Sequence, residues 1–149
     1  MLNLFIFFTI VGIIGLICYQ ANRNPRRMPK RRKIIGYKKV YVFDDLHYVR
    51  KIVIATLEIP RGTDRYQESR KHKSGVYLEP KCRTSEAKVL SLKEMYTGKD
   101  IEVATSGHDM SFNYRVGDTV RPRDGFDPAH ETCASGIHFY MLKRDAERH

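Results

Sequence analysis

The chain of 149 residues has no acidic side chain before Asp44 and only three cysteines. A low and odd cysteine count does not favour an oxidising compartment or a disulfide-built fold. The sequence contains neither a Gly-x-Ser-x-Gly elbow nor a complete phosphate-binding loop, so it carries no signature of those enzyme classes. It also has no internal repeat and no long low-complexity tract, which leaves room for one modest domain.

Because no Asp or Glu precedes Asp44, positive charge is concentrated in the N-terminal part of the chain. Nine basic residues precede Asp44, and the remaining 18 basic residues nearly balance 17 acidic ones, although the whole chain carries +10. Because the excess lies in one segment and is not spread over a folded face, we expect this segment to contact anionic lipid headgroups. Nucleic-acid binding by the same segment is an alternative. The basic cluster consists of Arg23, Arg26, Arg27, Lys30, Arg31, Arg32 and Lys33.

Residues 1–19 contain no charged side chain. The run is close to the length of about 20 residues that crosses a bilayer core, and it predicts a transmembrane helix. No positive charge precedes it and no small-x-small cleavage site follows it, which favours a retained anchor over a removed signal peptide. The predicted lipid-facing side chains include Leu4, Phe5, Phe8, Ile13, Leu16 and Tyr19.

The one-sided charge also predicts orientation. Lys and Arg next to a span stay on the cytosolic side, so we expect the N-terminus outside and the domain on the cytosolic face or its equivalent. The chain has no Asn-x-Ser/Thr acceptor, which agrees with that side. Residues 20–35 are predicted to form a basic, extended linker, because Pro25 and Pro29 oppose a helix.

Residues 36–149 are predicted to form a β-rich globular domain. Short runs of β-branched and aromatic residues lie between turn residues, as in an antiparallel sandwich or a barrel-like domain. The fold class is therefore mainly β, with one N-terminal transmembrane helix. We expect strands at 37–43, 50–60, 76–78, 81–83, 87–92, 101–105, 112–116, 119–122 and 136–142, and a short helix at 143–148.

A highly charged stretch over 63–74 lacks an apolar stripe and predicts a long surface loop. Loops of this length in small domains often carry function, so this region is the predicted contact with a protein partner. The residues assigned to that contact are Arg61, Arg65, Tyr66 and Arg70.

Few side chains point to catalysis. His130, Cys133 and His138 lie close in sequence, but their spacing lacks the second cysteine pair of a structural zinc site. We expect Cys82 and Cys133 to be buried thiols and His138 to be a core or edge histidine. The sequence therefore predicts no catalytic residue, no metal and no cofactor, with an enzyme that uses Cys133 and His138 as the alternative.

Several strings in the second half resemble a small uncharacterised domain of nucleocytoplasmic large DNA virus proteins and of some phage proteins, where it often accompanies pentapeptide repeats. The resemblance covers about residues 49–146 and implies no enzymatic activity and no catalytic residues. Its most specific part is Cys-Ala-Ser-Gly-Ile-His-Phe. The strings are Lys81–Arg83, Ala87–Leu90, Val116–Pro122, Gly125–Asp127 and Cys133–Phe139.

The anchor and the resemblance together predict a membrane-anchored minor capsid protein, a virion structural protein that links an internal viral membrane to the capsid shell. The expected partners are a lipid bilayer and capsid proteins, with no small-molecule substrate and no nucleic acid. Two alternatives remain: a membrane-tethered enzyme using Cys133 and His138, and a membrane-tethered nucleic-acid binder.

Overall fold

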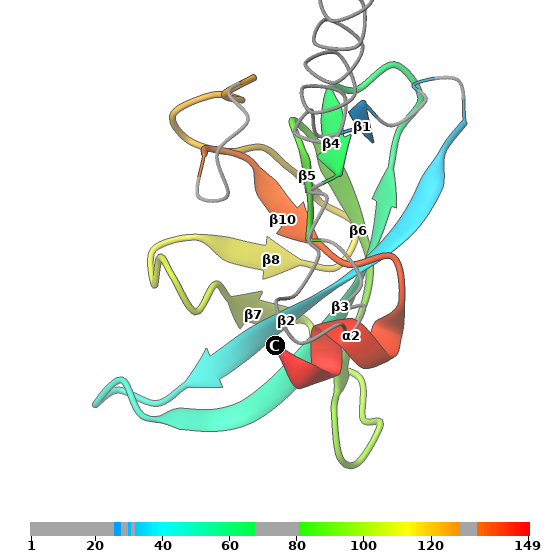
Figure 1. The fold of residues 1–149 in the computed structure, drawn as a ribbon. Helices are drawn as coiled ribbons and strands as arrows, with labels where there is room; N and C mark the ends of the chain where they lie inside the picture. The colour runs from blue at the N-terminus through cyan, green and yellow to red at the C-terminus, as the bar shows by residue number, and fades with distance from the viewer. Residues whose placement is uncertain (1–25, 28–29, 31, 68–80, 129–133) are drawn as a thin grey trace, which may run out of the picture.

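The structure of the chain is a computed structural model that describes residues 26–27, 30, 32–67, 81–128 and 134–149. Within them the strands form two antiparallel sheets (Figure 1). The main sheet has the order β8 (Asn113–Arg115), β7 (Val103–Thr105), β2 (Ile34–Phe43), β3 (Val49–Ile59), β6 (Ala87–Glu94) and β9 (Thr119–Val120). The small sheet has the order β1 (Arg26–Arg27), β4 (Arg65–Gln67), β5 (Cys82–Thr84) and β10 (Ile137–Phe139), and helix α2 (Lys143–Arg148) follows.

A long hairpin of β2 and β3 is the frame of the domain. Its turn is fixed by Asp44, whose Oδ1 accepts hydrogen bonds from the amides of Leu46 at 3.0 Å and Tyr48 at 2.8 Å. The other carboxylate oxygen pairs with Arg50 Nη2 at 2.7 Å. The turn at Asp44 thus has the side-chain-to-backbone bonds typical of an Asx turn.

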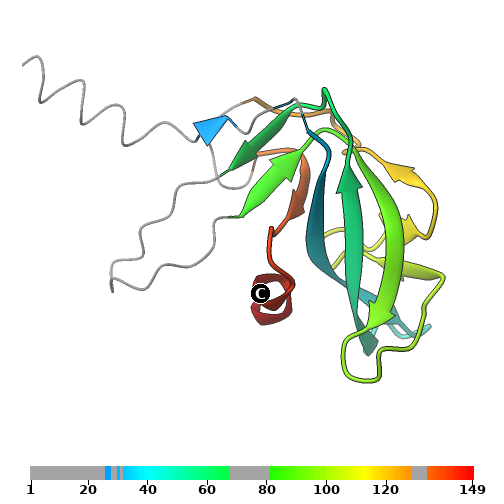
Figure 2. The ribbon, with the colours of Figure 1, turned by 90° about the vertical axis from the view of Figure 1, so that its right-hand side faces the viewer.

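The core lies on one face of this hairpin. Four alternating apolar residues of β3 are fully buried, as the period of two in the sequence predicts, namely Val53, Ala55, Leu57 and Ile59. The small sheet adds Cys82, Ile137 and Phe139 to the same cluster. Figure 2 shows β2, β3 and β6 side by side, with β4, β5, β10 and α2 next to them on the β2 side.

A close approach at Gly36 joins the two sheets. A Cβ atom at this position would lie 2.3 Å from Cδ2 of Phe139, so only glycine admits the ring. One residue farther along each chain, Tyr37 and Tyr140 exchange two backbone hydrogen bonds of 2.7 Å. The end of β10 is therefore held both against the face and against the edge of β2.

Most predicted elements are present. The antiparallel, mainly β architecture, the strand at Arg50–Pro60 and the short helix at 143–148 are confirmed. The predicted surface loop at 63–74 is wrong at its start, because Arg65–Gln67 pairs with Cys82–Thr84 as β4. The predicted strands at 87–92 and 101–105 appear as β6 and the shorter β7, which do not pair with each other, and a bridge joins Lys93 of β6 to Asp100. The predicted strand at 76–78 lies outside the described residues.

The predicted transmembrane fold needs a correction. No helix within the described ranges is long and apolar enough to cross a membrane. Helix α2 has 6 residues, which at 1.5 Å each span about 9 Å against a bilayer core of about 30 Å. The predicted span at residues 1–19 lies outside the described residues. The fold class is accordingly a mainly β domain with a short C-terminal helix, and the predicted single-pass topology and membrane localisation are not supported.

Candidate functional site

Lys38 stands where the strand pattern calls for an apolar side chain. It lies between Gly36 and Val40, on the face of β2 that carries the core, and it pairs with the fully buried Ala55 of β3. The small side chain of Ala55 leaves room beside the lysine. A charged side chain in this position is costly unless it is compensated.

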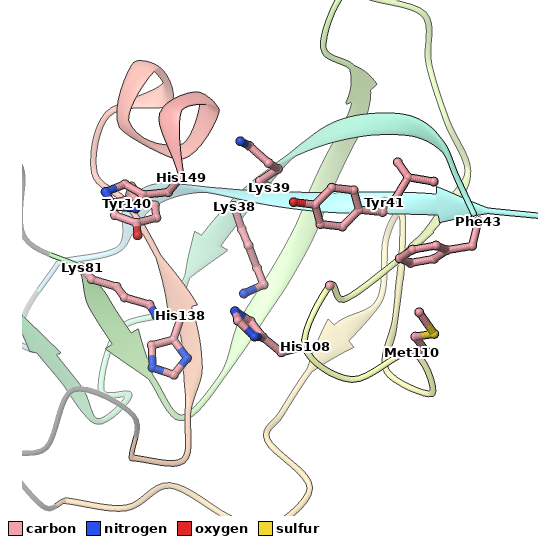
Figure 3. A pocket seen from close by; sticks show the side chains of 12 residues that line it. Lys38, Lys39, Tyr41, Phe43, Lys81, His108, Met110, His138, Tyr140 and His149 are labelled. Carbon is pink, nitrogen blue, oxygen red and sulfur yellow. The ribbon is translucent and has the colours of Figure 1, made fainter. Parts of the chain in front are cut away.

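A groove of about 560 Å³ opens at Lys38. We call it the basic groove. Its basic side chains are Lys38, Lys39, Lys81, His108, His138 and His149, and its remaining lining is Tyr41, Phe43, Val49, Gly107, Met110 and Tyr140. Among the described residues, no Asp or Glu lines it. Figure 3 shows Lys38 and His108 pointing toward one another, with Lys81 beside His138.

The electrostatics of the basic groove follow from this lining. Burial, and secondarily the charge of Lys81, lowers the pKa of Lys38 to about 8. Both effects disfavour the ammonium form. No carboxylate pairs with Lys38 in the described part of the chain. The attraction of a bound anion for the ammonium group would offset both effects, so the site is suited to a negatively charged group.

Four separate segments position these side chains. Lys38 comes from β2, Lys81 directly precedes β5, His138 lies in β10, and His108 lies in the turn after β7. Gly107 brings that turn close to β2, because a Cβ there would lie 2.6 Å from Cε2 of Tyr41. The site therefore depends on the tertiary fold and has no local sequence motif.

A second cavity of about 330 Å³ adjoins the basic groove and shares Lys38, His108 and His138 with it. It also contains Asp124 and Asp109. Oδ1 of Asp109 accepts bonds from Ser111 N at 2.9 Å and Ser111 Oγ at 2.5 Å. Those bonds, and then Arg123 at 3.8 Å, lower the pKa of Asp109. The Asp109 carboxylate thus accepts hydrogen bonds within the turn that contains it.

Arg83 stabilises the segment that borders the second cavity at Ser135. Its Nη1 donates to the carbonyl oxygens of Asp127 at 3.0 Å and Ser135 at 3.1 Å. Its guanidinium carbon lies 5.8 Å from the ring centre of Tyr66 and 5.6 Å from that of Phe126. These two rings stack at 5.4 Å. Arg83 thereby fixes the chain that leads into β10 and to His138.

The residues predicted to contact a partner are divided by the structure. Arg61 lies in the exposed turn after β3, whereas Arg65 and Tyr66 are only 2% and 7% exposed in β4. Arg65 Nη2 donates to the carbonyl oxygen of Arg32 at 2.6 Å. Arg70 lies outside the described residues. Arg65 and Tyr66 therefore belong to the interior of the domain.

The described part of the predicted linker contacts the domain. Lys30 pairs with Asp64, and Lys33 Nζ lies 3.0 Å from Glu58 Oε2. The strand β1, which contains Arg26 and Arg27, pairs with β4. The remaining basic-cluster residues Arg23 and Arg31 lie outside the described ranges, as do the anchor residues Leu4, Phe5, Phe8, Ile13, Leu16 and Tyr19.

The alternative catalytic pair is only half described. His138 lies in β10 between the buried Ile137 and Phe139, as predicted, and it lines the basic groove. Cys133 lies outside the described residues. Cys82 is fully buried in β5, which agrees with a buried thiol. No three His, Cys, Asp or Glu side chains are arranged to hold a metal ion in the ranges that the structure describes.

Sequence reasoning missed Lys38 as a site residue. It appeared only as one of the basic residues before Asp44. A signal did exist: Ile34, Gly36, Val40 and Val42 share its face of the strand, so a lysine there interrupts an otherwise uncharged row. His108 and Lys81 carry no such signal, because they reach the groove from a turn and from the residue before a strand.

Comparisons with known proteins give one match. No curated protein and no solved structure matches this chain. A family model, described as a family of unknown function (DUF5758), matches residues 24–146. The match includes β1 to β10 and all the basic-groove residues except His149. This chain therefore belongs to the DUF5758 family of unknown function.

Proposed function

We propose that this chain is a structural protein of a large DNA virus particle, and that it binds an acidic segment of another capsid protein in the basic groove. The proposal is for binding without catalysis. The viral setting is supported by the motif strings that resemble domains of such viruses, among them Cys-Ala-Ser-Gly-Ile-His-Phe. The binding site is supported by the arrangement around Lys38.

The observation that carries the proposal is the charge balance of the groove. Lys81 lies close enough to contribute to the lowered pKa of Lys38, and no described Asp or Glu lines the groove that both lysines share. Removing an ammonium group from water without a counter-charge is unfavourable. An acidic side chain of a partner would supply that counter-charge. Binding of the partner would therefore remove the cost of burying the Lys38 ammonium group.

The shape of the groove also suits a protein segment. A volume of about 560 Å³ lies within the range of about 300–1,000 Å³ that is typical of ligand sites. Tyr41, Phe43 and Met110 line it along with the basic side chains, so a segment with acidic and apolar residues finds complementary contacts for both. Aromatic residues and Met are enriched at protein interfaces.

Zero-length coupling in purified particles tests this function. A carbodiimide joins a lysine amine directly to a carboxylate, so the expected product links Lys38 or Lys81 to an Asp or Glu of another structural protein. Peptide mass mapping would identify both ends. Absence of the protein from purified particles, or coupling confined to lysines outside the groove such as Lys88, would contradict the proposal.

A binding measurement with the purified full chain gives a second test. A library of acidic peptides tiled from the capsid proteins is titrated against the wild type, Lys38→Gln and Lys88→Gln. Both variants lose one positive charge, but Lys88 is exposed on β6 and does not line the groove. We expect about a tenfold loss of affinity for Lys38→Gln, as for a charge-assisted bond, and little change for Lys88→Gln. Equal losses would indicate only non-specific attraction.

A further inference from the structure

We propose that the basic groove recognises a phosphorylated serine or threonine in an extended segment of the partner. This inference rests on the proposed function and names the group that the site would select. The geometry points to it through two independent features: the convergence of basic side chains around Lys38, and a stretch of strand edge at Lys39 for which the described residues supply no backbone partner.

The first feature is the number of donors that meet in one place. Lys38, Lys81, His108 and His138 all line the groove, and the charge of Lys81 adds to burial in lowering the pKa of Lys38. A carboxylate carries one charge on two oxygens. A phosphoryl group carries a charge of about −1.5 to −2 and offers three acceptor oxygens. It therefore matches two ammonium groups and further imidazole N–H donors more fully than an aspartate or a glutamate does.

The second feature is an interruption in the pairing of β2. On the edge away from β3, Tyr37 pairs with Tyr140 and Tyr41 pairs with Thr105. Lys39 lies between these two pairs. Because alternate residues of an antiparallel strand direct their N–H and C=O groups to the same edge, those of Lys39 point into the interruption. Within the described residues, no backbone partner is present for them.

The interruption offers one pairing position, at Lys39, because Tyr37 and Tyr41 on either side are paired with Tyr140 and Thr105. Four residue steps separate Tyr37 from Tyr41, which corresponds to about 13 Å at 3.3 Å per residue. A peptide in extended conformation presents an N–H and a C=O that complement those of Lys39, as in strand addition to a sheet edge. A nucleic-acid strand lacks this amide pair, so a peptide fits the edge better.

The register of such a peptide connects the two features. A residue placed opposite Lys39 directs its side chain to the same face as that of Lys39. Its neighbour in the peptide directs its side chain to the opposite face, on which Lys38 lies. A phosphorylated residue next to the residue that pairs with Lys39 would thus reach Lys38, and His108 lies toward Lys38 on that side (Figure 3).

Peptide titrations against the full-length chain test the proposal. A fluorescent peptide with one central phosphoserine is compared with the same peptide carrying Ser, and with one carrying Glu. We expect the phosphopeptide to bind about ten to a hundred times more tightly than the Ser form, and several times more tightly than the Glu form. An oligonucleotide of matched charge should compete weakly.

Variants and a modified peptide separate the two features. Lys38→Gln should remove most of the preference for the phosphopeptide over the Ser form, while Lys88→Gln should keep it. An N-methyl group on the peptide residue next to the phosphoserine should weaken binding to the wild type, because it blocks pairing with Lys39. If the methylated peptide binds as well as the parent, the strand-edge part of the proposal is wrong.

The outcomes distinguish this inference from the proposed function. Equal binding of the Glu and phosphoserine peptides would overturn phosphoryl selectivity and leave recognition of an acidic segment intact. Failure of all three peptides, together with strong oligonucleotide binding that Lys38→Gln abolishes, would overturn both. Tight binding of the Ser form would show that charge does not govern the groove.

Discussion

Gly36 and Lys38 lie two residues apart on the same face of β2, yet their surroundings are opposite. Gly36 is covered by the ring of Phe139, so closely that no Cβ atom fits. Lys38 faces a groove that no described Asp or Glu lines. One strand thus carries a close glycine–aromatic contact beside a charge that packing alone does not explain.

The two positions place the residues that stabilise the domain beside the residues proposed to bind a partner. The contact of Phe139 with Gly36 fixes β10 against β2 and thereby sets the position of His138 and Tyr140. Lys38 contributes nothing comparable, since its burial opposes its charged form. Substitutions at the two places should therefore change stability in opposite directions.

The largest expected effect comes from Phe139→Ala. Phe139 is fully buried between the sheets, and its loss leaves a cavity over Gly36. We expect the free energy of unfolding to fall by about 3–5 kcal/mol, as for other buried phenylalanines. Urea denaturation of the full chain measures this. A loss below about 1 kcal/mol would contradict the central role of this contact.

A smaller loss is expected for Gly36→Ala. The new methyl group would overlap the Phe139 ring, and overpacking of this kind costs about 1–3 kcal/mol. The double variant with Phe139→Ala should lose less stability than the sum of the two single variants, because the cavity accepts the methyl group. Strict additivity in a double-mutant cycle would show that the two residues do not act on each other.

Lys38→Met is expected to increase the free energy of unfolding, in contrast to the two preceding substitutions. An apolar side chain of similar length removes the desolvation cost, and we expect the free energy of unfolding at pH 7 to rise by about 1–3 kcal/mol. The same variant should lose binding of acidic or phosphorylated peptides. Lys88→Met, at an exposed position of β6, is the control and should change stability by less than about 0.5 kcal/mol. A lower free energy of unfolding for Lys38→Met would contradict the proposed cost of burying the Lys38 ammonium group.

The pH dependence sharpens this prediction. The pKa of Lys38 is lowered from 10.5 to about 8 on folding, so between these values the unfolded chain binds more protons than the folded one. Stability of the wild type should therefore rise with pH in this window relative to Lys38→Met. The advantage of the variant should be constant below pH 7 and shrink toward pH 10.5. A constant advantage across pH 7 to 10 would argue against a titrating Lys38.

The smallest effect is expected at the surface. Lys93 Nζ lies 2.7 Å from Asp100 Oδ1, but the two side chains are 51% and 83% exposed. Lys93→Ala should change the free energy of unfolding by no more than about 0.5 kcal/mol, because solvent and salt screen such pairs. A larger loss would mean that the bridge between β6 and the following segment stabilises the hairpin beyond its charges.

Much of the fold could be predicted from local pattern. The alternation in Arg50–Pro60, the Asx turn at Asp44 and the short final helix are properties of neighbouring residues. The strand Arg65–Gln67 could not, because its charged residues form a strand only through pairing with β5. Arg65 shows the same limit, since its burial depends on the carbonyl oxygen of Arg32.

The candidate site was far less predictable than the sheets. Its four central side chains come from β2, the residue before β5, β10 and a turn, so no spacing in the sequence brings them together. Lys38 alone interrupts a recognisable pattern. Arg83 and the Gly-Ile-His-Phe element were visible as motif residues, but their role in holding the chain at Ser135 depends on tertiary contacts.

The most direct test is an NMR titration of the Lys38 side chain in the full-length protein, with Lys38→Arg used to assign its signal. In the free protein we expect an apparent pKa of about 8. Addition of the phosphoserine peptide should raise it, because the bound anion stabilises the ammonium form. A pKa of the free protein near the ordinary value of 10.5, or one that does not move when the peptide binds, would contradict the assignment of Lys38 as the centre of an anion-binding site.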